Sequence, residues 1–96
     1  MQIITPEEAR RILQESREID ILDVRTPNEF KEEHLEKAIN INFYDHDFPE
    51  KMAKLSRNKK YLVYCHSGGR AVKTGELMEE LGFKEVLVVE GEMIGE

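Results

Sequence analysis

The sequence predicts an α/β fold with a parallel sheet, because short apolar runs alternate along the chain with segments that carry helical patterns. The runs lie at residues 21–24, 39–41, 61–64 and 86–89, and a short first strand is expected at residues 2–4. Runs rich in β-branched and aromatic residues are typical of strands buried on both faces. The segments between them are long enough for crossover connections. Strands that alternate with helices in this way favour a parallel sheet with right-handed crossovers.

Four segments carry signals for helices between these strands. Residues 5–8 (Thr-Pro-Glu-Glu) form a capping box with proline at the first helical position, and residues 26–29 (Thr-Pro-Asn-Glu) repeat it. Asp47 is the expected cap of a third helix. An apolar face with helical spacing predicts the last helix over residues 70–81, and Gly82 suits the left-handed position after its end.

Length, charge and cysteine content limit the possible functions. The chain has 96 residues, which fits one domain over residues 1–96, and its formal net charge of −6 argues against a broad surface for nucleic acid or anionic membranes. No stretch approaches the ~20 apolar residues of a membrane span, and the N-terminus lacks the pattern of a signal peptide. We therefore expect a cytoplasmic protein that binds neither nucleic acid nor membranes. The single cysteine excludes an internal disulfide.

Two chemistry-bearing segments follow predicted strands. Asp23-Val24-Arg25 comes at the end of one strand, and Cys65 comes directly after another. In open α/β sheets, ligands bind at the carboxyl ends of the strands. The sequence therefore predicts the functional site at this edge of the sheet.

The segment that follows the third long apolar run is a tight loop leading into a helix. Cys65 stands at the strand end, Ser67-Gly68-Gly69 form a compact turn, and Arg70 opens the helix. Glycines allow backbone N–H groups to point inward, and together with a helix N-terminus these groups form a cradle for an anion. Such a cradle would stabilise a thiolate or a persulfide at Cys65. The alternative is an inert, buried cysteine at a strand end.

At this point the sequence resembles a known family, the single-domain rhodanese-like sulfurtransferases. Residues 65–70 (Cys-His-Ser-Gly-Gly-Arg) look like the active-site loop of that family. Residues 21–30 resemble its Asp-Val-Arg segment, residues 34–41 its His-Ile to Asn-Ile segment, and residues 80–91 its last helix, strand and glycine turn. The resemblance implies a three-layer α/β/α fold with a central parallel sheet of about five short strands.

Loop length distinguishes the chemistry within this resemblance. Related Cdc25-type phosphatases use a loop one residue longer, and cysteine-based phosphatases carry a His-Cys-x5-Arg signature. Here four residues separate Cys65 from Arg70, and the residue before the cysteine is Tyr64. The spacing favours transfer of a sulfur atom over the larger phosphoryl group.

By resemblance, the reaction is a double displacement that needs no metal and no organic cofactor. Cys65 would attack the outer sulfur of thiosulfate or a persulfide, and the Cys65 persulfide would then yield its sulfur to cyanide, a thiol or a protein acceptor. The acceptor must come from outside, because the chain holds no second cysteine. The residues expected to bind the anionic donor are Arg70, His66, Ser67, Gly68 and Gly69.

Three charged residues near the predicted site have two interpretations. Asp23, Arg25 and Glu29 could form a catalytic acid group, but a set of ion pairs and hydrogen bonds that supports the active-site loop is the preferred interpretation. The three histidines and one cysteine show no metal-ligand spacing, so we predict no metal site.

Several positions depart from the family pattern and leave other functions open. Glu33 and Lys37 stand where glycines usually flank the His-Ile segment, and Glu92 replaces a second glycine. The chain ends at Glu96, where the family usually continues, so the pocket is expected to be open or completed by a partner. The first alternative function is a sulfur-carrier or regulatory binding module with little activity on small donors. A cysteine-based phosphatase or arsenate reductase is the other.

Overall fold

The computed structural model describes residues 1–94 of the chain, so the expectation about the chain end at Glu96 lies outside the described residues. Its helices and strands follow one another in the order β1 (Gln2–Ile4), α1 (Pro6–Glu15), β2 (Ile19–Asp23), α2 (Pro27–Glu32), β3 (Ile39–Asn40), α3 (Phe48–Ala53), β4 (Lys60–Tyr64), α4 (Gly69–Glu80) and β5 (Glu85–Val89). No helix within residues 1–94 is both long enough and apolar enough to cross a membrane.

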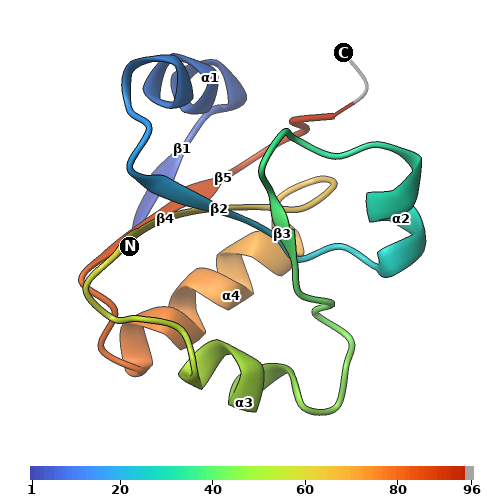
Figure 1. Ribbon diagram of the computed structural model, residues 1–96, viewed down its shortest axis with the longest axis vertical. Helices are drawn as coiled ribbons and strands as arrows, with labels where there is room; N and C mark the ends of the chain where they lie inside the picture. Colours follow the sequence, from blue (N-terminus) through green and yellow to red (C-terminus); the bar gives the residue numbers. More distant parts are fainter. Residues whose placement is uncertain (95–96) are drawn as a thin grey trace.

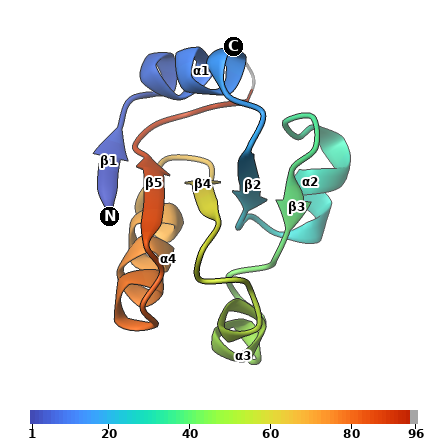
Figure 2. The same cartoon turned by 60° about the vertical axis from the view of Figure 1, so that its left-hand side comes forward.

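The five strands form one parallel sheet in the order β1-β5-β4-β2-β3 (Figures 1 and 2). The central strand β4 pairs with β2 on one side and β5 on the other, while the two-residue β3 forms one edge. Because all strands run the same way, their carboxyl ends meet at one edge of the sheet. The order places the end of β4, and therefore Cys65, in the middle of that edge.

The helices form layers on the two faces of the sheet. The core on one face lies beneath α3 and α4 and includes Phe48, Met52 and Met78, which pack on the sheet residues Val63 and Val88. The opposite face is covered by α1 and the C-terminal segment, with Ala9 and Met93 in its core. Figure 1 shows α1 on one side of the sheet and α3 with α4 on the other. The prediction of a three-layer α/β/α fold is confirmed.

The helix α2 differs from the others because none of its six residues is buried. Both views place it beside β3, at the edge of the sheet (Figures 1 and 2). Its position is set instead by its N-terminus, where the Thr26 hydroxyl accepts a hydrogen bond from the Glu29 N–H at 3.3 Å and the Glu29 carboxylate accepts one from the Thr26 N–H at 3.0 Å. The capping box predicted at residues 26–29 is confirmed, and it fixes the direction of the Glu29 side chain.

Three further helix ends were predicted from the sequence, and the structure confirms two of these predictions. Thr5 and Glu8 form the predicted capping box of α1. Gly82 follows α4 with φ of +87°, the left-handed conformation predicted for it. Asp47 is the N-cap residue of α3, but within the described structure its side chain makes no capping hydrogen bond. Its backbone is not extended (φ −98°, ψ 18°), and its carboxylate lies 3.6 Å from the Lys51 ammonium instead.

Candidate active site

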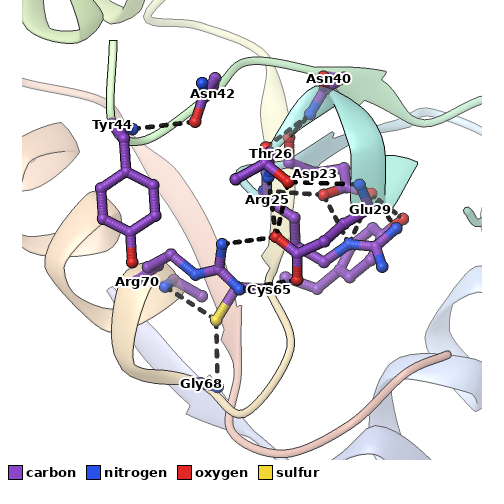
Figure 3. A network of polar contacts seen from close by, with 12 residues as sticks. Asp23, Arg25, Thr26, Glu29, Asn40, Asn42, Tyr44, Cys65, Gly68 and Arg70 are labelled. Carbon is purple, nitrogen blue, oxygen red and sulfur yellow. Dashed lines mark hydrogen bonds and ion pairs between the residues drawn. The ribbon is translucent and has the colours of Figure 1, made fainter. Parts of the chain in front are cut away.

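Cys65 directly follows β4 and is 1% exposed. Its sulfur accepts hydrogen bonds from two backbone N–H groups, that of Gly68 at 3.1 Å and that of Ala71 at 3.3 Å (Figure 3). Ala71 is the third residue of α4, so the sulfur also lies at the positive end of that helix. Two N–H donors and the helix N-terminus favour negative charge on the sulfur.

Gly68 gives the loop its shape. Its φ of +112° lies in the region that L side chains rarely adopt, and a Cβ atom at this position would lie 3.3 Å from both the Glu90 Cα and the Gly91 nitrogen. A side chain here would be strained by its backbone conformation and crowded by the turn that follows β5. The glycine therefore allows the loop to turn its N–H groups toward Cys65 while the loop packs on residues 90–91.

Arg70 is held by Glu29. Its two terminal nitrogens lie 2.9 Å and 3.2 Å from the two carboxylate oxygens of Glu29, which is the bidentate geometry of a strong ion pair (Figure 3). The hydrogen bond from Arg70 is the main reason that the pKa of Glu29 is lowered to about 2, and the same bond raises the pKa of Arg70. The guanidinium also lies 5.6 Å from the centre of the Tyr44 ring.

A second ion pair, between Asp23 and Arg25, is hydrogen-bonded to Tyr64, the residue before Cys65. The Asp23 side chain is fully buried and that of Arg25 is 6% exposed, and the two are joined at 2.7 Å. The Tyr64 hydroxyl donates to Asp23 at 2.7 Å and accepts a hydrogen bond from the Leu35 N–H at 3.0 Å. Burial lowers the pKa of Arg25, but the hydrogen bond and charge of Asp23 more than offset it, so the pKa is raised. Burial, with the nearby Asp23 carboxylate, raises the pKa of Tyr64.

Two members of this network were missed by the sequence analysis. Tyr64 was noted as part of an apolar strand and as the residue before Cys65, but not as a hydrogen-bonding group, although its hydroxyl joins Asp23 to the Leu35 backbone. The side chain of Asn40 donates to the carbonyl oxygens of Asp23 at 3.0 Å and Arg25 at 2.9 Å. The sequence signals for Asn40 were its place between two isoleucines and its match to the Asn-Ile segment of the family pattern.

An open cavity of about 620 Å³ lies beside the loop. Its lining joins the start of α2, the segment before α3, the loop and the start of α4: Thr26, Glu29, Phe43, Tyr44, His66, Ser67, Gly69, Arg70 and Lys73. Cys65 is not among the residues that line this cavity, because its side chain is buried beneath the loop. In this structure the sulfur is therefore not open to the cavity.

The remaining loop residues occupy the rim. The His66 side chain is 63% exposed, and its Nε2 atom lies 3.2 Å from a carboxylate oxygen of Glu92. The contact falls on Glu92, one of the positions that departs from the family pattern.

Lys37, another position that departs from the family pattern, adopts a φ of 69°. It therefore takes the left-handed conformation that a glycine would adopt without strain. Within residues 1–94, no group of three His, Cys, Asp or Glu side chains is placed to hold a metal ion.

Comparison with known proteins identifies the family. A model of the Rhodanese-like domain family matches residues 5–93. The chain belongs to the rhodanese-like family. A crystal structure of a rhodanese-like domain protein from Staphylococcus aureus, 31% identical, superposes with a TM-score of 0.83 over 97% of this chain and 88% of that protein.

Two curated relatives carry names that state an activity. YtwF of Bacillus subtilis (strain 168), a provisionally named sulfurtransferase, is 37% identical over 82% of this chain and 75% of its own length. The thiosulfate sulfurtransferase GlpE of Coxiella burnetii is 34% identical over 77% of this chain and 67% of its own length. The family resemblance predicted from the sequence is confirmed.

Proposed function

We propose that this rhodanese-like protein is a sulfurtransferase that moves a sulfane sulfur from thiosulfate or a persulfide donor to a thiol or cyanide acceptor. The observation that carries the proposal is the pair of N–H groups from Gly68 and Ala71 on the Cys65 sulfur, at the N-terminus of α4. Such a cradle holds a nucleophilic sulfur anion before the reaction and is suited to the anionic end of a persulfide after it. The names of the two curated relatives support the same chemistry.

The reaction has two displacement steps. In the first, the Cys65 thiolate attacks the outer sulfur of the donor, a new bond forms to the Cys65 sulfur, and the S–S bond of the donor breaks. The electron pair of that bond leaves with sulfite or with a thiolate. In the second, the acceptor attacks the outer sulfur of the Cys65 persulfide, and the electron pair returns to Cys65.

The other residues hold this arrangement in place. Arg70 supplies positive charge next to the loop, and Glu29 orients it. The pair Asp23–Arg25, tied to Tyr64, anchors the residue that precedes Cys65. None of these five side chains donates a hydrogen bond to the Cys65 sulfur in the described structure, so Asp23, Arg25, Glu29 and Tyr64 act by positioning and Arg70 acts through its charge.

One observation favours a second candidate. Cys65 is 1% exposed and lies outside the cavity lining, so the protein could serve as a sulfur carrier or regulatory module that exchanges sulfur only when a partner opens the loop. Such a module would react slowly with small donors and quickly with a persulfide on a partner protein.

The intact mass of the protein after incubation with a donor distinguishes these functions. We expect the wild-type protein to gain the mass of one sulfur atom from thiosulfate or cysteine persulfide, and to lose it on addition of cyanide. The Cys65→Ser variant should gain none. A wild type that gains no sulfur from either small donor would contradict the enzyme and favour the carrier.

A further inference from the structure

The charge balance around the cavity limits which donors fit. Arg70 and Lys73 line it with positive charge, but Glu29 lines it too and occupies both terminal nitrogens of Arg70. The three side chains together leave one net positive charge. Thiosulfate carries two negative charges on one small ion, so it would approach the Glu29 carboxylate without a free guanidinium to offset it.

Glu29 cannot turn away easily. Besides Arg70, its carboxylate accepts hydrogen bonds from the N–H group of Thr26 at 3.0 Å and from its hydroxyl at 3.1 Å. These bonds belong to the capping box of α2, so moving the carboxylate would also uncap the helix. A donor that needs Arg70 must therefore compete with a carboxylate held by four hydrogen bonds.

The cavity also offers an apolar wall. Tyr44 is 66% exposed, although large aromatic side chains are usually buried. Its ring packs edge-on against Phe43, which in turn contacts Phe48 in the core, and its backbone N–H is held by Asn42 at 3.0 Å. The ring is thus supported from behind and leaves apolar surface exposed, while its hydroxyl end points toward Arg70 in Figure 3.

Building on the proposed function, we infer that the site selects sulfur donors with one negative charge on the outer sulfur and an organic group behind it. Organic persulfides and thiosulfonates belong to this class, and thiosulfate does not. Glu29 acts as the residue that disfavours the dianion, and Tyr44 as the surface that receives the organic group. Neither residue takes part in the bond changes.

The step has the same atom balance for each donor. The Cys65 thiolate bonds to the outer sulfur, and the donor's S–S bond breaks. The electron pair leaves on a thiolate from a persulfide, on a sulfinate from a thiosulfonate, or on sulfite from thiosulfate. The products differ only in the leaving group, so charge and the organic group are the properties that the site can distinguish.

Methanethiosulfonate and thiosulfate form a matched pair of probes, because a methyl group replaces one charged oxygen. We would measure kcat/KM for both, with cyanide as acceptor, in wild type, Glu29→Gln and Glu32→Gln. Glutamine retains the capping box at position 29, and Glu32 is an exposed carboxylate at the end of the same helix. For each variant we compare the ratio of the two kcat/KM values. The difference in intrinsic reactivity between the two donors is the same in every variant and cancels in this comparison.

The expected result is that Glu29→Gln raises the kcat/KM for thiosulfate relative to methanethiosulfonate by about tenfold, while Glu32→Gln changes the ratio by less than about twofold. Tyr44→Ala should lower the preference for benzenethiosulfonate over methanethiosulfonate by about fivefold, because the ring loses its contact surface. An unchanged donor ratio in Glu29→Gln, or an equal shift in Glu32→Gln, overturns this inference and leaves sulfur transfer intact. Failure of wild type to take sulfur from any of these three donors and from cysteine persulfide overturns both proposals.

Discussion

Two ion pairs flank the Cys65 loop, and they differ in burial and in what else holds them. Asp23–Arg25 has side chains 0% and 6% exposed, whereas Glu29–Arg70 has side chains 34% and 17% exposed. Both are bidentate in effect, with nitrogen–oxygen distances between 2.7 and 3.2 Å. The first is buried next to Tyr64, the residue before Cys65, and the second lines the cavity beside the loop.

The difference shows what each pair can do. Asp23–Arg25 is almost completely buried, and it makes further hydrogen bonds to the Tyr64 hydroxyl and to the carbonyl oxygen of Glu33, which accepts from Arg25 at 2.6 Å. Separating such a pair would leave charges in a medium that solvates them poorly. Glu29–Arg70 faces the cavity, where water can solvate either partner if the other is removed. The buried pair therefore fixes geometry, and the cavity pair can respond to ligands.

The largest effect is expected from breaking the buried pair. Asp23→Ala leaves the Arg25 guanidinium buried without its carboxylate and removes the acceptor of the Tyr64 hydroxyl, so we expect the free energy of unfolding to fall by about 3–5 kcal/mol. Urea denaturation measures it. The control is Asp20→Ala, which removes a carboxylate 37% exposed and 3.5 Å from the Lys59 ammonium. That variant should change the free energy by less than about 1 kcal/mol. Equal losses in the two variants would contradict the role given to burial.

Breaking the cavity pair should affect donor binding more than folding. In Arg70→Ala the Glu29 carboxylate stays beside the loop without its cation, so we expect KM for thiosulfate to rise about tenfold. The free energy of unfolding should fall by less than about 1 kcal/mol. Lys73→Ala, which removes a positive charge from the same cavity but no ion pair in the described structure, should raise KM less. An unchanged KM in Arg70→Ala would remove that residue from donor binding.

The smallest effect concerns acid. Because the pKa of Glu29 is lowered from 4.5 to about 2, its ion pair adds stability that is fully present above pH 4.5 and is lost as the pH falls toward 2. Urea midpoints of wild type and Glu29→Gln, compared from pH 7 downward, measure this. The gap between the two proteins should be constant above pH 4.5 and shrink below it. A gap that does not depend on pH would mean that the pair is not formed in solution.

Local signals predicted the elements well, because capping and periodicity depend on residues close in sequence. The box at residues 26–29 is an example: the same Thr and Glu that mark the start of α2 in the sequence exchange hydrogen bonds in the structure. Gly82 after α4 is another. Asp47 failed as a side-chain cap, because its backbone conformation, set by the preceding turn, does not direct the carboxylate to the helix N–H groups.

The candidate site was predicted less completely, because its contacts join distant parts of the chain. The sequence grouped Asp23, Arg25 and Glu29 as one supporting set, but in the structure Glu29 pairs with Arg70 on another element. Tyr64 gave no signal of its hydrogen bonds, since a tyrosine within an apolar run has the same pattern whether its hydroxyl is bonded or free. The partners become visible only when β2 and β4 lie side by side.

By itself, the sequence determined the alternation of strands and helices, the family, and the loop from Cys65 to Arg70, because each depends on short-range spacing. Tertiary structure decided which side chains surround and support that loop. The pairing of β2 with β4 brings Asp23 next to Tyr64, and the packing of α2 beside the loop brings Glu29 to Arg70. The order of the strands and the crossover connections bring side chains together that are far apart in sequence. The charge that faces a donor is therefore the sum of the charges on these side chains.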